Sequence, residues 1–517
     1  MINQKVKYAI IFLIMLSPIS VQGAMLDFIS PAEPGQQVKL KDNNTSEPTY
    51  SSNPQKARLT HNDVTNHYDI AMQRFMQSNV KSAYMDFKML IRNIVPNDYA
   101  YLRMADEMAE IGLFNLSNQA IQKAGDKDIS FVQAEDIKKF YFPKNMLSEE
   151  DEIYLAEIYS NIMYNAQSKE ATAELLKNSD LLSKSDYADY IAALGSLKSG
   201  DAKTAKKYID NALDKNENNI NYQKLKIEID IQNEDFREAL NILKGIKSRK
   251  LYTSEYINKI NTLEYYTLYK TEHNDTMKKY YLGYYYYSIG EDVKAIRTLQ
   301  SAITSKKKSN RLVYALMAEI YYNQKEYEKA QNFAEKSLQL GGNNQQALTV
   351  LGKLNYKNKS YEEALKYFKS ASSGNNITAM TWLAMTYNKI GKNNQAKSIY
   401  YKILKDSNDC YQAYYDVALQ DKDREFEYYK KAVSINLKFI DGWVGLAKYS
   451  IEKNNLQSAN KYLEIVKYID ENDFRYYYYQ GLVYKAKGLY QDANYYFKKS
   501  LAINPENASA KKELGIL

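Results

Sequence analysis

The stretch that decides the fold runs from Phe474 to Asn507 and reads FRYYYYQGLVYKAKGLYQDANYYFKKSLAINPEN. Small residues stand at its eighth and twentieth places, Gly481 and Ala493, and apolar or aromatic residues recur around them. A glycine between the two halves marks a turn, and Pro505 near the end cannot continue a helix. The pattern predicts two helices joined by a short turn.

The same frame recurs upstream at an interval of 34 residues. Moving back one interval places these residues in equivalent positions: Trp443, Leu446, Ala447, Leu456, Ala459 and Leu463. We place twelve repeats, beginning near Val64, Asp98, Glu152, Asp186, Ile220, Thr276, Arg311, Gln345, Ile377, Tyr411, Ile440 and Phe474. Two stretches, around 132–151 and 254–275, fall outside the frame. The repeat from Tyr411 is predicted to lose about five residues from its second helix.

One pair of helices cannot bury its apolar face, whereas stacked pairs bury it between neighbours. A small residue such as Gly481, facing Ala493, lets two backbones approach closely while larger residues fill the space around them. The period and the small residues at places eight and twenty resemble the tetratricopeptide repeat family over most of the chain. The resemblance implies an all-α fold: a right-handed superhelical solenoid of antiparallel helix pairs with an extended concave surface.

The chain has 517 residues, of which 45% are hydrophobic and 26% charged, as in a folded protein. Prolines among polar residues predict a disordered tether before the repeats. We therefore expect five segments: a signal peptide at 1–24, the tether at 25–62, divergent helical repeats at 63–253, an irregular helical connector at 254–275 and a C-terminal solenoid at 276–510.

The first residues carry Lys5 and Lys7, then an apolar stretch, then small residues near Gly23. This order is typical of a secretory signal peptide cleaved after Gly23 or Ala24. An uncleaved membrane anchor is the alternative, although the apolar stretch is short for a span. The abundance of Lys, Asn, Ile and Tyr indicates an AT-rich bacterial genome. Together with the signal peptide, this predicts a periplasmic or secreted protein that is not integral to the membrane after cleavage. Cys410 is the only cysteine, which excludes an intrachain disulfide.

Two runs of four tyrosines occur, at 284–287 and 476–479. They could form a binding surface or they could pack in the core. Successive residues in a helix point about 100° apart, so four tyrosines in a row cannot share one face. By their places in the repeat, Tyr286 and Tyr477 are predicted to lie in the core.

In the family that the chain resembles, the second, fifth, ninth, twelfth and thirteenth places of the first helix tend to line the concave groove. The corresponding residues chosen here are Tyr280, Tyr284, Tyr287, Tyr322, Asn323, Tyr356, Lys357, Asn388, Lys389, Tyr415, Lys448, Tyr478 and Lys485. This composition suits an extended peptide or a glycan, because tyrosine combines a large rigid ring with a hydroxyl. Genome bias toward tyrosine is the alternative explanation. The lysine and asparagine clamp that holds a C-terminal carboxylate in chaperone-docking domains is absent from its places.

Catalytic and metal sites need clustered groups, and the sequence offers none. The three histidines, His61, His67 and His273, are poorly placed to act together. Acidic runs such as 149–152 are predicted to lie at the N-terminal ends of helices, where their negative charge interacts favourably with the helix dipole. The formal charge of +8 is spread along the chain, and its one basic cluster, 306–308, fits a solvated loop, so no nucleic-acid partner is expected. We expect no enzyme activity, no cofactor and no metal.

Three functional hypotheses remain. The first is a non-enzymatic scaffold in the bacterial envelope that docks partner proteins in its groove, within a secretion, polysaccharide-export or pilus-assembly machine. The second is a glycan-binding module that uses the groove tyrosines. The third is an enzyme with a small insertion, which predicts a buried polar pocket within 132–151 or 254–275.

Overall fold

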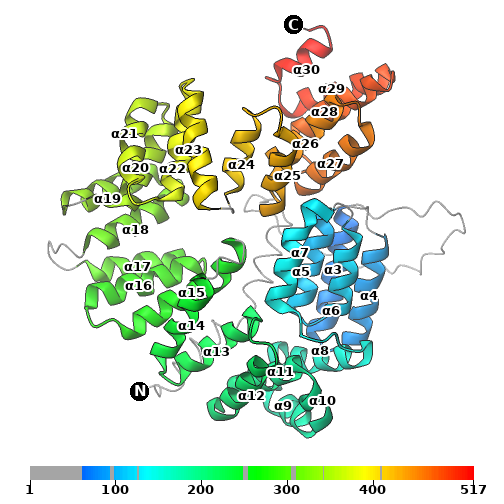
Figure 1. Ribbon diagram of the computed structural model, residues 1–517, viewed down its shortest axis with the longest axis vertical. Helices are drawn as coiled ribbons and strands as arrows, with labels where there is room; N and C mark the ends of the chain where they lie inside the picture. Colours follow the sequence, from blue (N-terminus) through cyan, green and yellow to red (C-terminus); the bar gives the residue numbers. More distant parts are fainter. Residues whose placement is uncertain are drawn as a thin grey trace, which may run out of the picture.

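The computed structural model describes residues 61–93, 98–124, 127–248, 254–303, 310–341, 343–407 and 410–516. Every element within these ranges is a helix, and consecutive helices pack in antiparallel pairs (Figure 1). The predicted all-α solenoid is therefore confirmed. The predicted signal peptide, nearly all of the tether and the basic cluster at 306–308 lie outside the described residues.

The helix pairs follow the predicted frame. First helices are α3 (His61–Met76), α5 (Asp98–Glu110), α8 (Glu149–Tyr164), α11 (Asp186–Lys198), α13 (Ile220–Gln232), α16 (Asp275–Ser288), α18 (Asn310–Asn323), α20 (Gln345–Lys357), α22 (Ile377–Lys389), α24 (Tyr411–Ala418), α26 (Ile440–Glu452) and α28 (Phe474–Ala486). Their partners are α4 (Val80–Asn93), α6 (Phe114–Lys123), α9 (Ser168–Lys177), α12 (Ala202–Lys215), α14 (Phe236–Ser248), α17 (Asp292–Ala302), α19 (Tyr327–Gln339), α21 (Tyr361–Ala371), α23 (Asn393–Asp406), α25 (Glu425–Ile435), α27 (Leu456–Ile469) and α29 (Tyr490–Ile503). Each predicted repeat begins within one helical turn of the start of a first helix.

Four helices stand outside this pairing. They are α7 (Lys127–Tyr141), α10 (Ser179–Lys184), α15 (Ser254–Thr271) and α30 (Ala508–Glu513). Of the two stretches that fell outside the frame, 254–275 holds α15, which packs against both α14 and α16. The other overlaps α7, which packs against α5 and α13.

Local chemistry sets where the helices begin and end. At many starts a short polar side chain caps the free amides, as where Asn344 Oδ1 accepts a hydrogen bond from the Ala347 amide at 3.0 Å. At the end of most first helices, the residue at place fifteen adopts a left-handed backbone, for which glycine is the least strained choice. These residues are Ser78, Gly112, Ala166, Gly200, Glu234, Gly290, Lys325, Lys359, Gly391, Asn454 and Gly488. The repeated glycine of the sequence is thus a helix stop.

The small residue at place eight seats a large side chain of the partner helix. A methyl group on Gly352 would lie 2.5 Å from Cε1 of Phe368, and one on Gly481 would lie 2.5 Å from Cε1 of Phe497. Gly481 therefore faces the ring of Phe497, where the sequence suggested Ala493. Each such pair locks two helices of a repeat together in a space that leaves no room for a side chain at place eight.

Replacing Gly352 by alanine should lower the free energy of unfolding by about 1 to 3 kcal/mol, because the added methyl group overpacks the Phe368 ring. Gly245 in α14 is the matched control, since nothing lies within 4 Å of the methyl group that Gly245→Ala would add. That control should be neutral or stabilise by about 0.5 to 1 kcal/mol. Urea denaturation followed by circular dichroism measures both, and equal midpoints for the two variants would contradict the packing argument.

The tyrosine runs divide between core and surface, but the ring that is fully buried is not the expected one. Tyr285 is 2% exposed and Tyr476 is 3% exposed, whereas Tyr286 and Tyr477 are half-buried and pack against the edge of the core. In the first run the cause is α15, whose Tyr266 lies 5.3 Å from Tyr285 between ring centroids. An extra helix outside the repeat frame therefore changes which face of α16 is covered.

The repeat from Tyr411 is shortened in its first helix, so the expectation of a loss in the second helix is wrong. Its first helix, α24, has 8 residues, where α22 and α26 have 13. Its second helix, α25, has 11 residues, as α21 does. The helix stops early because the amides of Gln420 and Asp421 both turn back to the carbonyl of Val417.

The solenoid bends round until its late repeats reach its early ones. Helix α25 packs against α7, and α27 approaches α5 (Figure 1, where blue and cyan helices meet orange ones). One continuous apolar cluster includes buried residues from Ala71 to Tyr285 and from Ala418 to Val483. The repeats between them form separate smaller clusters. We call the contact of α5 and α7 with α25 and α27 the seam.

Candidate functional site

A set of tyrosine rings stacks along α15 and α16. Tyr280, Tyr284 and Tyr287 are spaced by four and three residues, which places them on one face of α16. Tyr265 of α15 stacks on Tyr284 with centroids 4.0 Å apart, and Tyr280 and Tyr287 meet the same ring at 5.9 and 6.2 Å. All four rings are half-buried. The expected groove residues of this repeat therefore lie together, with one face of Tyr284 covered by the chain itself.

The row of rings continues over the next three first helices. Asn323 of α18 donates a hydrogen bond to the Tyr287 hydroxyl at 2.5 Å, and its neighbour Tyr322 carries the row forward. The ammonium group of Lys353 lies 5.4 Å from the Tyr322 ring and 5.7 Å from Trp382, which permits cation–π attraction. Trp382 in turn meets Tyr356 at 5.3 Å. We call Tyr265, Tyr280, Tyr284, Tyr287, Tyr322, Tyr356 and Trp382 the aromatic ladder.

One carboxylate, Glu319 of α18, lies close enough to several groups of the ladder to influence their pKa values. Burial, reinforced by neighbouring Tyr265 and by Glu319, raises the pKa of the Tyr284 hydroxyl far above its usual value. Burial and Glu319 likewise raise the pKa of Tyr287 to about 12. Burial lowers the pKa of Lys353, and the same carboxylate opposes that shift. The phenols therefore stay protonated at any physiological pH and can serve as hydrogen-bond donors.

The other predicted groove residues do not join the ladder, and most contact a neighbour in the chain. Lys357 lies over the ring of Tyr327, Asn388 accepts from Gln420, Tyr415 packs on Tyr429 and Phe439, Lys448 pairs with Glu452, Tyr478 packs on Phe497, and Lys485 pairs with Glu513 of α30. Lys389 is exposed at the end of α22. The structure thus gathers the predicted tyrosines of α16, α18 and α20, with Asn323, and leaves the other predicted groove residues apart.

Sequence reasoning missed four members of this site. Glu319 and Lys353 stand at place nine of their repeats, a place that the family resemblance assigns to the groove, so that signal was available. Trp382 stands at place six, which carries no such expectation. Tyr265 belongs to α15, outside the repeat frame, and only the tertiary structure brings it to Tyr284.

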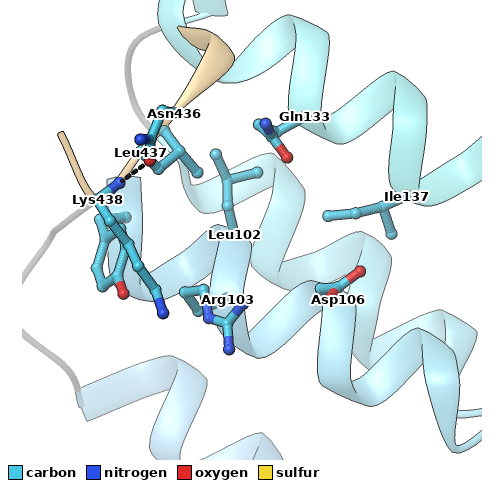
Figure 2. Close-up of a pocket in the computed structure, with 9 residues that line it drawn as sticks. Leu102, Arg103, Asp106, Gln133, Ile137, Asn436, Leu437 and Lys438 are labelled. Atoms are coloured by element: carbon cyan, nitrogen blue, oxygen red, sulfur yellow. Dashed lines mark hydrogen bonds between the residues drawn. The ribbon is translucent and has the colours of Figure 1, made fainter. Parts of the chain in front are cut away.

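A second candidate site is a cavity of about 240 Å³ at the seam (Figure 2). Its lining consists of Tyr99, Leu102, Arg103, Asp106, Gln133, Ile137, Asn436, Leu437 and Lys438. The side chains of Arg103 and Lys438 extend to one side of it, and Gln133 and Ile137 lie on the other (Figure 2). Two of the lining residues come from the 132–151 stretch in which an enzyme would need a polar pocket. Among the described residues that line this cavity, none is a histidine, a cysteine or a serine, so they do not pair a nucleophile with a histidine base.

Other chemistry is sparse within the described ranges. No group of three or more His, Cys, Asp or Glu residues there could hold a metal ion. His273 is exposed, and Cys410 is half-buried with its Sγ 3.7 Å from the hydroxyl of Thr381. Among the helices that the structure describes, none has the length and apolar character of a membrane span.

Comparisons with known proteins find helical repeats. The family model for subunit 3 of the anaphase-promoting complex, or cyclosome, matches residues 305–371. A TPR repeat-containing protein of Methanocaldococcus jannaschii, MJ1428, is 27% identical over 213 residues, which are 39% of this chain. The chain spans about a third of that relative's length, 32%.

Two solved structures are also similar. The Cut9–Hcn1 hetero-tetramer of the anaphase-promoting complex is 15% identical, over 88% of this chain and 96% of the other, with a TM-score of 0.40. MamA is 24% identical, over 30% of this chain and 96% of its own, with a TM-score of 0.27.

Proposed function

Because this chain is a tetratricopeptide-repeat protein, and such repeats generally form protein-interaction scaffolds, we propose that it is a non-enzymatic scaffold of the bacterial envelope. In this role it docks partner proteins as part of a secretion, polysaccharide-export or pilus-assembly machine. The charged and apolar leader of the sequence supports export, and a single cysteine is compatible with an oxidising compartment.

The aromatic ladder is the observation that carries the proposal. It runs across α15, α16, α18, α20 and α22, so it offers a line of contacts and not one pocket. Half-buried rings provide a large rigid area at low entropic cost, and their hydroxyls add hydrogen bonds. Glu319 and Lys353 add one charge of each sign. An extended peptide segment fits this combination, because its backbone offers donors and acceptors at regular intervals along a line.

The ladder also supports a second candidate, a glycan-binding module. Sugar rings stack on exposed aromatic faces, and phenol hydroxyls bond to sugar hydroxyls. The two candidates differ in what binds to the same residues, so one set of variants separates them.

Tyr356→Ala should weaken partner binding roughly tenfold, which corresponds to about 1.4 kcal/mol, because it removes the ring that α20 contributes next to Trp382 in the ladder. Tyr490→Ala is the control, since this tyrosine is 65% exposed on α29 and lies outside the ladder. Crosslinking in the native cell followed by mass spectrometry identifies the partner, and titration of that partner measures the change. Loss of polysaccharide binding in Tyr356→Ala, with protein binding intact, would favour the glycan module. Equal protein binding by both variants would refute the ladder as the docking site.

A further inference from the structure

The aromatic ladder already holds a cation of the chain at one end. The ammonium group of Lys353 lies 5.4 Å from the ring centroid of Tyr322 and 5.7 Å from that of Trp382. A positive charge is attracted to the negative face of an aromatic ring, and more strongly where water is partly excluded. This end of the ladder is therefore occupied by a side chain of the protein itself.

The rings at the other end of the ladder carry no such cation. All four are half-buried, and we call them the tyrosine patch: Tyr265, Tyr280, Tyr284 and Tyr287. In the part of the chain that the structure describes, no lysine or arginine lies over any of these rings, although Lys270 of α15 lies over Tyr266 and Tyr269. The accessible faces of the patch are therefore not used by the described cations of the chain.

The rings of the patch face in more than one direction. Tyr265 stacks on Tyr284 at an angle of only 20°, so it covers one face of that ring. Tyr280 and Tyr287 stand at 77° and 68° to the Tyr284 ring, with centroids 5.9 and 6.2 Å away. Inclined rings at this spacing let one cation lie within about 6 Å of more than one ring centroid. The geometry of the patch thus suits a single organic cation.

A carboxylate without a cationic partner lies beside the patch. Glu319 precedes Asn323 by one turn of α18, and Asn323 donates a hydrogen bond to the Tyr287 hydroxyl at 2.5 Å. Burial raises the pKa of all four patch hydroxyls, and the charge of Glu319 adds to the shift at each of them. The Oε2 atom of Glu319 accepts a hydrogen bond from the neutral amide of Gln346, and among the described residues no lysine or arginine forms an ion pair with this carboxylate. A half-buried negative charge therefore stands uncompensated next to the rings.

Lys353 of the following repeat does not neutralise Glu319. The two residues hold place nine of successive repeats, but the ammonium group of Lys353 lies against two rings and forms no ion pair with the carboxylate. Burial lowers the pKa of Lys353 and Glu319 opposes that shift, so the two charges interact without direct contact. The ladder is thus divided into a negative end at the patch and a positive end at Lys353. Complementary charges on a partner would fix its register along such a surface.

We propose that the tyrosine patch and Glu319 bind an arginine side chain of the partner segment that docks along the ladder. The guanidinium group is planar, so it can stack on a tyrosine ring while its N–H groups donate hydrogen bonds to the carboxylate of Glu319. A lysine carries the same charge but has no planar face to stack. This inference rests on the proposed docking function and adds the chemistry and register of the partner. Its basic residue lies over α16 and α18, and Lys353 disfavours a second basic residue one repeat further along.

A labelled peptide of alternating arginine and glycine residues probes the patch directly. The chain has a formal charge of +8, so its overall field opposes a cationic peptide and any binding points to a local site. The peptide should bind the full chain, and Glu319→Gln should weaken that binding at least roughly tenfold in fluorescence polarisation. The new amide keeps the size of the side chain and can still accept from Gln346, so the fold is retained.

Glu328→Gln is the matched control for this substitution. It removes the same charge from the exposed first turn of α19, the second helix of the same repeat, and lies outside the ladder. This variant should bind the arginine peptide as the native chain does. Equal affinity of Glu319→Gln and the native chain, or no binding of the peptide to the native chain, would overturn the proposal.

Two further peptides test the chemistry of the ligand. Citrulline in place of arginine keeps the shape of the side chain and removes its charge, so that peptide should bind at least roughly tenfold more weakly. A peptide with glutamate in place of arginine should bind no more tightly than the citrulline peptide. Equal binding of the arginine and citrulline peptides would refute a cation site. Tighter binding of the glutamate peptide would show that Lys353, and not Glu319, selects the ligand.

The partner captured by crosslinking separates this inference from the proposed function. Glu319→Gln and Tyr356→Ala should both weaken its binding, since both residues belong to the surface along which it docks. If Tyr356→Ala weakens the binding and Glu319→Gln does not, the arginine site is refuted while the docking function stands. If neither substitution weakens it, both are refuted.

Discussion

Trp443→Ala should lower the free energy of unfolding of the C-terminal repeats by about 3 to 5 kcal/mol, the largest effect expected of a single substitution here. The side chain is fully buried in α26 and packs against Tyr462 with centroids 6.0 Å apart. Its Nε1 donates a hydrogen bond to the carbonyl of Leu437 at 2.7 Å. Since Leu437 lines the seam cavity, the substitution removes packing in the repeat and the anchor of a seam residue together.

The protein's other tryptophan, Trp382, is the matched control. It is half-buried, and its ring lies 5.9 Å from Phe368 and 5.3 Å from Tyr356. Trp382→Ala should destabilise by roughly half as much or less, because less apolar surface returns to water. Urea denaturation with hydrogen exchange as a local readout measures both effects. A larger loss for Trp382→Ala than for Trp443→Ala would contradict this account.

The protein should lose stability as pH rises from about 5 to 8, and Glu152→Gln should remove a large part of that loss. Glu152 of α8 is fully buried, and its Oε2 accepts hydrogen bonds from the amide of Asn115 at 2.8 Å and from Asn115 Nδ2 at 2.9 Å. Burial raises its pKa from 4.5 to about 8, while the Asn115 bonds oppose the shift. The folded state therefore binds a proton that the unfolded state releases above its own, lower pKa.

The sign of the effect follows from that difference. Below pH 4.5 both states hold the proton and the group makes no demand on stability. As pH rises toward 8, the unfolded state gains from ionisation, so the free energy of unfolding falls by at most about 5 kcal/mol from this residue. Burial raises the pKa of Glu107 to about 7 and of Asp230 to about 6, so some slope will persist in Glu152→Gln. Thermal denaturation between pH 5 and 8 measures it.

Glu149→Gln is the control for this pH dependence. Glu149 lies in the same helix turn, but its side chain is 53% exposed and pairs with Lys88 at 3.1 Å. Exposed pairs contribute little to stability, and the Glu149 charge adds to the raised pKa of Glu152 less than burial does, so this variant should keep most of the native slope. A slope that is unchanged in Glu152→Gln would show that Glu152 ionises in the folded state near its ordinary pKa.

The repeat frame could be predicted because its signals are local. A capping side chain, a glycine for the left-handed stop and a small residue against a large one all act within one repeat, so Gln345 and Phe474 begin helices as expected. Lys226, an unusual residue for its place, is explained only by its neighbours: it is 9% exposed and pairs with Asp210 at 2.8 Å and with Asp230 at 3.4 Å. Such compensation is invisible in the pattern of one repeat.

The seam and the position of Tyr265 in the ladder could not be predicted, since both depend on segments outside a single repeat. The return of α25 to α7 is the sum of many small rotations between repeats, none of which has a sequence signature. Tyr265 reaches Tyr284 from a helix outside the frame. Glu319 and Lys353, by contrast, could have been found by applying the groove rule at place nine of their repeats, as it was applied to Tyr284.

The position of α7 has a consequence for biosynthesis. Helix α7 leaves the ribosome about 300 residues before Ile435, the carbonyl partner of its Gln133. At roughly 5 to 20 residues per second, translation takes about 15 to 60 seconds to cover that distance. In a chain that folds from its N-terminus, α5 and α13 can cover part of α7 early, but the part that α25 covers stays exposed to aggregation during this interval. A holdase that binds nascent α7 would protect the early repeats until the last ones are made.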